Sequence, residues 1–286
     1  MKKKFCHGGS QKVKNIETAE QALQNPEYKK ALVELLYQLA DDDFFHAYRG
    51  AEWLGLAPHI EEDVAFSSIN QDTMGHAAMY YGLLEELGEG KADDLAHARK
   101  SVDRRNAVLN ELVNGSGTYL EEPRYDWAFT VVRHYFYDVY KKLKLESLKL
   151  SSYRPLAEAA VKINMEQYYH VMHWKVWFQQ LSMSEGEGRN RMLDAIEKVW
   201  GEFADVLSYG PLSSEMSRHG LLMDEESFTE KWKVHMKQVF ESIDLTFPGG
   251  CAMKSGSGRQ GIHTDDLEQA LDTLGEVYRL DTEAVW

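Results

Sequence analysis

Two stretches of the sequence nearly match Glu-x-x-His, a spacing with which one helix presents a carboxylate and an imidazole to the same metal site. His76 is preceded three positions earlier by Thr73, and His170 is preceded three positions earlier by Gln167. Residues three apart lie on one face of a helix, so an intact motif directs both donors to one place. Thr and Gln carry no charge. The two segments therefore predict a metal site that has lost two carboxylates.

Acidic residues at the middle of other helical segments complete this pattern. Asp43, the last of three consecutive aspartates, lies among apolar residues, and Asp138 lies inside the segment HYFYDVY. Glu166 directly precedes Gln167, which places it about 100° around the helix from the motif position. A pair of iron ions needs several carboxylates for charge balance, and this set is short of them.

Each of these residues also has a purely structural interpretation. Asp43 fits a surface position where two helices cross, and His76 fits a hydrogen-bonded core histidine. Asp72 lies four positions before His76, so the two fit a contact within one helix. Glu166 and His170 have the same spacing and fit the same kind of contact. The aromatic run in this last segment fits a core or a subunit interface better than a cofactor site.

Long helices must position these residues, and the sequence predicts four of them. Asn25 followed by Pro26 is typical of a helix start, and Gly55 is typical of the end of that helix. Leucines at positions 32, 35, 36 and 39 repeat with the spacing of one helix face. The predicted long helices cover residues 25–55, 60–87, 125–148 and 155–181.

Shorter helices are expected between and after these four. They cover residues 92–101, 103–113, 189–207 and 224–243, with a last helix from 264. No β-hairpin and no alternation of strands with helices is indicated. The predicted fold class is all-α, a ferritin-like four-helix bundle with additional packed helices. Residues 1–24 are predicted to form a flexible polar leader, and residues 25–286 a single helical domain with a C-terminal extension.

Composition excludes several classes of function. The net charge of −14 argues against nucleic-acid binding, which needs a basic surface. Cys6 and Cys251 are the only cysteines, so neither a disulfide framework nor a thiolate metal site is indicated. No apolar run approaches the roughly 20 residues of a membrane span. These features indicate a cytoplasmic protein without a membrane anchor.

Four blocks of the sequence, taken in order, resemble the PaaC family. They are GAEWLGLAPHIEEDVAFSSINQDTMGHA, VVRHYFYDVY, MEQYYH, and the C-terminal part from GIHTDDL to Trp286. The resemblance implies the non-catalytic ferritin-like subunit of the phenylacetyl-CoA ring-1,2-epoxidase, an enzyme of phenylacetate degradation. The partners that it implies are a catalytic sister subunit that holds the di-iron centre, a reductase and a further small subunit. A homodimer is also compatible with it.

The resemblance implies no cofactor in this chain and only vestigial ligand positions. The vestigial di-iron positions are Asp43, Thr73, His76, Asp138, Glu166, Gln167 and His170. Two alternatives remain open. One is a self-sufficient ferritin-like di-iron oxidase or oxygenase, which needs a working ligand set among these residues. The other is a helical interaction or storage protein without a link to oxygenation.

A short basic stretch and three aromatic residues are the candidate binding groups outside that site. The stretch holds Arg99, Lys100, Arg104 and Arg105, and it predicts contacts with the phosphates of coenzyme A. A solvated basic face, or a docking patch for an acidic neighbour, is the alternative. The predicted anchors of a subunit interface are Tyr135, Tyr137 and Trp174.

Overall fold

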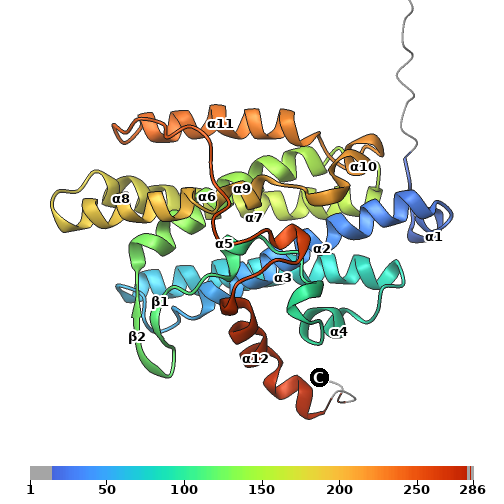
Figure 1. Ribbon diagram of the computed structural model, residues 1–286, viewed down its shortest axis with the longest axis horizontal. Helices are drawn as coiled ribbons and strands as arrows, with labels where there is room; N and C mark the ends of the chain where they lie inside the picture. Colours follow the sequence, from blue (N-terminus) through green and yellow to red (C-terminus); the bar gives the residue numbers. More distant parts are fainter. Residues whose placement is uncertain (1–14, 282–283, 285–286) are drawn as a thin grey trace, which may run out of the picture.

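Four long helices form the centre of the molecule. The computed structural model describes residues 15–281 and residue 284. The four helices are α2 (Pro26–Ala51), α3 (Ile60–Glu86), α6 (Trp127–Leu148) and α7 (Arg154–Ser182). Figure 1 shows them along the long axis, with α2 beside α3 and α6 beside α7. The predicted ferritin-like bundle and all-α fold class are confirmed.

Local signals fix where these helices begin. The Asn25 side chain accepts a hydrogen bond from the Tyr28 N–H at 3.2 Å, and Pro26 occupies the first turn. The Asp126 side chain accepts from the Ala128 N–H at 2.9 Å. Such caps satisfy backbone N–H groups that have no partner within the helix. The sequence prediction of the long helices rested on signals of this kind at Asn25 and Pro26.

Shorter helices surround the bundle. α8 (Glu187–Trp200) and α11 (Glu225–Glu241) lie against the α6 side of the bundle (Figure 1). The other short helices are α1 (Ala19–Leu23), α4 (Ala92–His97), α5 (Val108–Glu111), α9 (Phe203–Leu207), α10 (Ser213–Arg218) and α12 (Asp265–Leu280). Three single turns of 3-10 helix are η1 (Ser101–Asp103), η2 (Gly210–Leu212) and η3 (Gly258–Gln260). Within the described part of the chain, no helix is both long and apolar enough to cross a membrane.

The position of α6 between these layers buries nearly its whole surface. Its residues 128–141 are all buried, so the chain's own core absorbs the aromatic side chains of this helix. Tyr135 and Tyr137 are among them, and Trp174 of α7 is also fully buried. The prediction of these three residues as interface anchors is therefore wrong. A large aromatic residue satisfies the packing demands of a core as well as those of an interface.

Two segments differ from the predicted secondary structure. Strands β1 (Gly115–Thr118) and β2 (Glu121–Tyr125) form an antiparallel hairpin where no hairpin was expected. Residues 103–113 were predicted as one helix. The structure has only the single turn α5 (Val108–Glu111) there, after the end of η1 at Asp103. Here the backbone N–H of Arg105 donates to Asp41 Oδ2 at 2.8 Å, and that of Ala107 donates to Asp42 Oδ1 at 2.7 Å. These tertiary partners replace the hydrogen bonds of a helix.

Part of the segment predicted as a flexible leader is structured. Ile16 forms a parallel bridge with Tyr153, and its N–H donates to the Ser152 carbonyl at 2.8 Å. Helix α1 follows, and its Ala22 is fully buried. Residues 1–14 of the predicted leader lie outside the described residues. The predicted helix over 189–207 is interrupted after Trp200, which separates α8 from α9.

Candidate functional site

A buried lysine connects all four helices of the bundle. The Lys141 ammonium on α6 forms an ion pair with Asp43 Oδ2 on α2 at 2.9 Å. The same nitrogen lies 2.9 Å from His76 Nδ1 on α3. The other ring nitrogen of His76, Nε2, lies 2.6 Å from Glu166 Oε2 on α7. Each bundle helix thus contributes one residue to a single chain of polar contacts across the core.

The chemistry of lysine fixes which ring nitrogen of His76 carries the proton. An ammonium group only donates hydrogen bonds, so Nδ1 of His76 accepts and Nε2 carries the proton that it donates to Glu166. Burial, followed by the charge of Lys141, holds the pKa of His76 far below its usual value. His76 is therefore neutral. The Lys141 ammonium contacts the Asp43 carboxylate directly. It reaches the Glu166 carboxylate only through the His76 ring, which accepts a hydrogen bond from Lys141 and donates one to Glu166.

Of the two carboxylates in this chain of contacts, Asp43 is the buried one and Glu166 is partly exposed. Its second oxygen, Oδ1, accepts a hydrogen bond from the Tyr137 hydroxyl at 3.1 Å. Burial raises the pKa of Asp43, while the ion pair with Lys141 opposes that shift. A charged pair inside a protein persists only when its geometry and its remaining hydrogen bonds are good. The sequence interpretation of Asp43 as an exposed residue at a helix crossing is wrong, because this side chain is buried.

A second histidine pairs across the same two helices. His170 Nε2 on α7 lies 3.1 Å from Asp72 Oδ2 on α3. Burial, followed by the charge of Lys141, lowers the pKa of His170 to about 4. The pairings within one helix that the four-residue spacing suggested do not form. Asp72 contacts His170 instead of His76, and Glu166 contacts His76 instead of His170.

The remaining predicted ligand positions stay outside this chain of contacts. The Thr73 hydroxyl donates to the Ile69 carbonyl one turn earlier, at 2.8 Å. The Gln167 amide donates to the Asp138 backbone carbonyl at 3.4 Å. Asp138 Oδ2 is buried without a hydrogen-bond partner, and burial raises the pKa of this carboxyl to about 7. Thr73 and Gln167, two of the predicted vestigial positions, therefore make ordinary structural contacts.

These residues do not fit a pair of iron ions. Ferritin-like metal centres use a carboxylate from each of two helices and a Glu-x-x-His pair from each of the others. Here an ammonium group, which has no lone pair to donate to a metal, lies between Asp43 and His76. Among the described residues, no group of three or more His, Cys, Asp or Glu side chains is arranged to hold a metal ion.

Lys141 was missed in the sequence, although a signal was present. It follows Asp138 by three positions, so both lie on one face of α6. It also precedes Lys142, and a run of lysines normally indicates a solvated face. Only the enclosure of α6 by other helices shows that Lys141 and Lys144 are buried.

Comparison with known proteins places this bundle in a family. The model of a family described as phenylacetic acid catabolic protein matches residues 4–286. The chain belongs to this family. It is 26% identical over 250 residues to the C subunit of the 1,2-phenylacetyl-CoA epoxidase of Escherichia coli (strain K12), a match that covers 87% of this chain and 96% of that protein. It is 23% identical over 226 residues to the A subunit from the same organism, a match that covers 77% of this chain and 66% of that protein.

The basic stretch of this family member does not form one exposed patch. Arg104 is fully buried and lies 3.2 Å from Asp41 Oδ1, and Arg99 Nη2 lies 2.6 Å from Asp41 Oδ2. Arg105 lies 3.5 Å from Glu34. Arg104 is therefore not accessible to a phosphate, because its guanidinium is bound inside the protein. Lys100 and Arg105 retain exposed surface, and their contact with coenzyme A stays a prediction.

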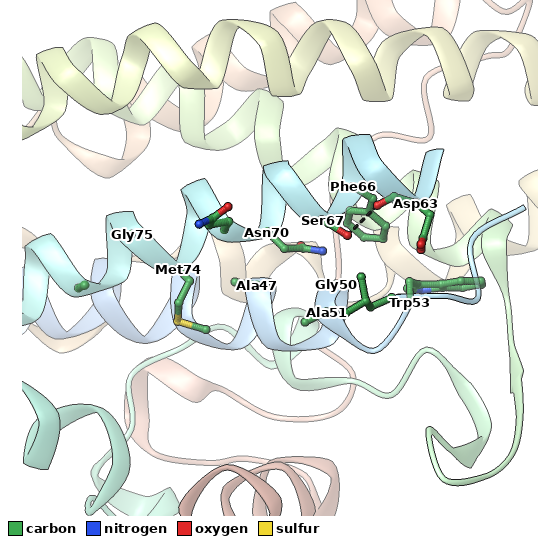
Figure 2. Close-up of a pocket in the computed structure, with 13 residues that line it drawn as sticks. Ala47, Gly50, Ala51, Trp53, Asp63, Phe66, Ser67, Asn70, Met74 and Gly75 are labelled. Carbon is green, nitrogen blue, oxygen red and sulfur yellow. Dashed lines mark hydrogen bonds between the residues drawn. The ribbon is translucent and has the colours of Figure 1, made fainter. Parts of the chain in front are cut away.

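A groove follows the seam between α2 and α3. Its volume is 440 Å³, and its lining is mostly apolar, with Trp53, Phe66 and Met74 among the large side chains. Figure 2 shows these residues with the small side chains of α2 between them. At Gly50 a Cβ atom would lie 2.0 Å from Asn70 Oδ1, so the two helices approach closely here. None of the groove residues belongs to the Lys141 chain of contacts.

The outer face of α7 exposes a row of large apolar side chains. They recur at helical spacing and flank Glu166, which is itself partly exposed. This apolar row comprises Val161, Met165, Tyr168, Tyr169, Met172 and Val176. Single exposed apolar residues are ordinary, whereas several of them along one helix face are typical of a binding surface.

Proposed function

We propose that this chain is the non-catalytic partner subunit of a multicomponent oxygenase that epoxidises the aromatic ring of phenylacetyl-CoA. In this proposal, a catalytic sister subunit of the same fold holds the di-iron centre. This chain carries no cofactor and supports the sister subunit structurally. The similarity to the C subunit of an epoxidase, along 96% of the length of that protein, supports the assignment.

One observation distinguishes this function from that of a self-sufficient di-iron oxidase. The Lys141 ammonium lies 2.9 Å from both Asp43 and His76, the two predicted ligand positions that meet at the bundle centre. An oxidase that activates oxygen at this place needs a metal there, and lysine is a poor neighbour for a cation. The arrangement favours a structural role over a catalytic one.

The apolar row on α7 supports association with the sister subunit. Met165 and Tyr169 are 64% and 70% exposed, which is unfavourable unless a partner covers them. The match to the A subunit indicates that a potential partner shares this fold, and long helix faces of two such bundles can pack together. A homodimer, the reductase and the further small subunit remain part of the proposal without a surface assigned to them.

Co-expression with a candidate catalytic subunit tests the function. We expect the two chains to elute together in size-exclusion chromatography at micromolar concentration, with iron following the catalytic chain. This chain purified alone is expected to hold well under one iron per subunit. Separate elution of the two chains contradicts the partner role. About two irons in this chain alone contradicts the non-catalytic role and restores the oxidase.

A further inference from the structure

We propose that the β1–β2 hairpin is an arm that enters the groove between α2 and α3 of a second copy of this chain, so that two copies exchange arms in a symmetric dimer. This dimer is the homodimer to which the proposed function assigns no surface, and to that extent the inference rests on the proposed function. The contacts that support it belong to this chain alone.

The hairpin has the form of an arm. Figure 1 shows it extending away from the bundle helices, and no residue of its two strands is buried. Its tip carries Tyr119 and Leu120, which are 49% and 88% exposed. A two-stranded hairpin alone in water is only marginally stable. Large apolar side chains at such a tip are therefore typical of a contact with another molecule.

The groove offers a site of matching chemistry. Its lining is mostly apolar over a volume of 440 Å³, and the Asn70 side chain, only 8% exposed, forms no hydrogen bond within the described part of the chain. Figure 2 shows Asn70 between α3 and Gly50 of α2. A side-chain amide both donates and accepts hydrogen bonds. The groove thus suits a turn whose side chains are apolar and whose backbone N–H and C=O groups need a partner.

The arm and the groove meet at the same end of the molecule. Trp53 lines the groove, and its ring lies edge-on to that of Tyr125, the last residue of β2, with ring centroids 5.5 Å apart. The arm from Tyr125 to Leu120 is about 17 Å long, and the groove side of α3 from Asp63 to Ala78 is about 22 Å long. An arm that starts beside one groove is therefore long enough to enter the groove of a copy placed against the same end. A two-fold axis then forms both contacts at once.

The charges favour a second copy at this place. Two chains of net charge −14 repel each other over most of their surfaces. Among the described residues that line the groove, Asp63 is the only charged one, and its Oδ1 accepts a hydrogen bond from the Gly55 N–H at 2.7 Å. On the arm, Arg124 Nη2 lies 3.4 Å from Glu122 Oε2. The contact between arm and groove thus avoids most of the repulsion.

The test uses this chain alone, in sedimentation velocity experiments over micromolar concentrations, where we expect the wild type to form dimers. The arm variant, Tyr119→Ser with Leu120→Ser, is expected to weaken dimerisation by at least about 100-fold, because apolar burial is lost at two symmetric contacts. The groove variant, Ser67→Trp, fills the groove with its own ring and should have the same effect. Both should fold, since neither changes a core residue.

The matched control is Tyr168→Ser with Leu150→Ser. These residues are 50% and 85% exposed, close to the values of the two tip residues, and they belong neither to the arm nor to the groove. The control is expected to dimerise like the wild type. If it weakens the dimer as much as the arm variant does, the effect is a general loss of exposed apolar surface, and the proposal fails.

A mixture of the two variants gives the decisive measurement. The arm variant keeps a working groove and the groove variant keeps a working arm, so one contact forms in a mixed dimer and none forms in either variant alone. We expect differently labelled variants to pair on mixing. A mixture that pairs no more than the separate variants overturns the exchange of arms.

A monomeric wild type overturns the proposal as well. If the arm variant then loses binding to the co-expressed catalytic subunit, the arm belongs to that subunit's interface. In that case the proposed function stands while the inference of a symmetric dimer fails.

Discussion

Arg259 and Asp42, 217 positions apart in the chain, form a two-point ion pair inside the molecule. Nη1 of the arginine lies 3.0 Å from Oδ1 of the aspartate, and Nη2 lies 2.7 Å from Oδ2. Both side chains are buried. The pair fastens the turn η3, which precedes α12, to the middle of α2. The pair thereby helps to fix the C-terminal part of the chain to the bundle, together with the hydrogen bond that Arg49 Nη2 on α2 donates to the Asp266 carbonyl at 2.8 Å.

This pair belongs to a larger pattern on α2. Asp41, Asp42 and Asp43 are consecutive, and successive helix positions point about 100° apart. Each carboxylate therefore meets a different part of the chain and a different cation. The cations are Arg99 and Arg104 for Asp41, Arg259 for Asp42, and Lys141 for Asp43. The three aspartates hold a loop, the C-terminal segment and α6 around one helix.

Arg259→Met is expected to reduce the free energy of unfolding by about 3–5 kcal/mol, because Asp42 remains buried without its partner. Urea unfolding followed by circular dichroism measures the change. Arg154→Met is the control, since Arg154 forms ion pairs with Glu17 and Glu158 on the surface, where solvent screens them. Equal losses in the two variants contradict the role given to the buried pair.

Much of the fold could be predicted from the sequence, because helix signals are local. Asn25 and Pro26 mark the start of α2, and the leucine spacing that follows marks its buried face. The bundle follows from four such segments. The region after Ser101 could not be predicted in this way, because Asp41 and Asp42 accept the backbone N–H groups of Arg105 and Ala107. Those partners lie more than 60 positions away.

The sequence pointed to several residues of the buried polar contacts but missed their central residue, Lys141. Asp43 and His76 both contact the Lys141 ammonium at the bundle centre, and their interpretation as vestigial metal ligands stays a prediction. Spacing along one helix suggested that Glu166 contacts His170, yet each finds its partner on α3. Sequence periodicity shows which residues share a face but not which helix that face meets. For the same reason the sequence did not single out Lys141, whose burial depends on the helices that surround α6.

Substitutions in the basic stretch are expected to separate structure from binding. Arg104→Ala should reduce the free energy of unfolding by about 2–3 kcal/mol, because hydrogen bonds to the charged Asp41 are lost. Lys100→Ala with Arg105→Ala should leave stability nearly unchanged. Only this double variant then reports on coenzyme A, through the apparent KM for the acyl-CoA in the reconstituted complex. Unchanged kinetics with intact assembly assign both residues to a solvated surface.

Lys144 gives a pH dependence with a definite sign. Burial, followed by the charge of Arg259, lowers the pKa of Lys144 from 10.5 to about 7, although Asp42, Asp43 and Glu225 oppose that shift. Above about pH 7 the folded chain has released this proton while the unfolded chain keeps it. The contribution of Lys144 to the free energy of unfolding therefore rises with pH from about 7 toward 9. This contribution is lowest below about pH 7, where the buried amine is charged.

Lys144→Met removes this titration. We expect the variant to be more stable than the wild type near pH 7, and the difference between the two to shrink as the pH approaches 9. Melting temperatures of both proteins across that range measure it, and the difference cancels the titration of other groups. A difference that stays constant with pH contradicts the lowered pKa.

The apolar row on α7 gives the prediction that bears most directly on assembly. A charged residue in the middle of a subunit interface must lose its hydration without gaining a partner, which costs several kcal/mol. Met165→Glu with Tyr169→Glu should therefore weaken association with the catalytic subunit by at least about 100-fold. The monomer itself should keep its stability, because both side chains are exposed.

Val234→Glu is the matched control for this surface. Val234 is 56% exposed and lies on α11, away from the apolar row on α7. The substitution Val234→Glu adds one negative charge at an exposed apolar position of the same acidic chain. Biolayer interferometry on the immobilised catalytic partner then compares the variants at fixed ionic strength. Loss of binding in the α7 variant alone places the interface on α7. Equal weakening by Val234→Glu assigns the effect to general charge repulsion, and full binding by the α7 variant removes this face from the interface.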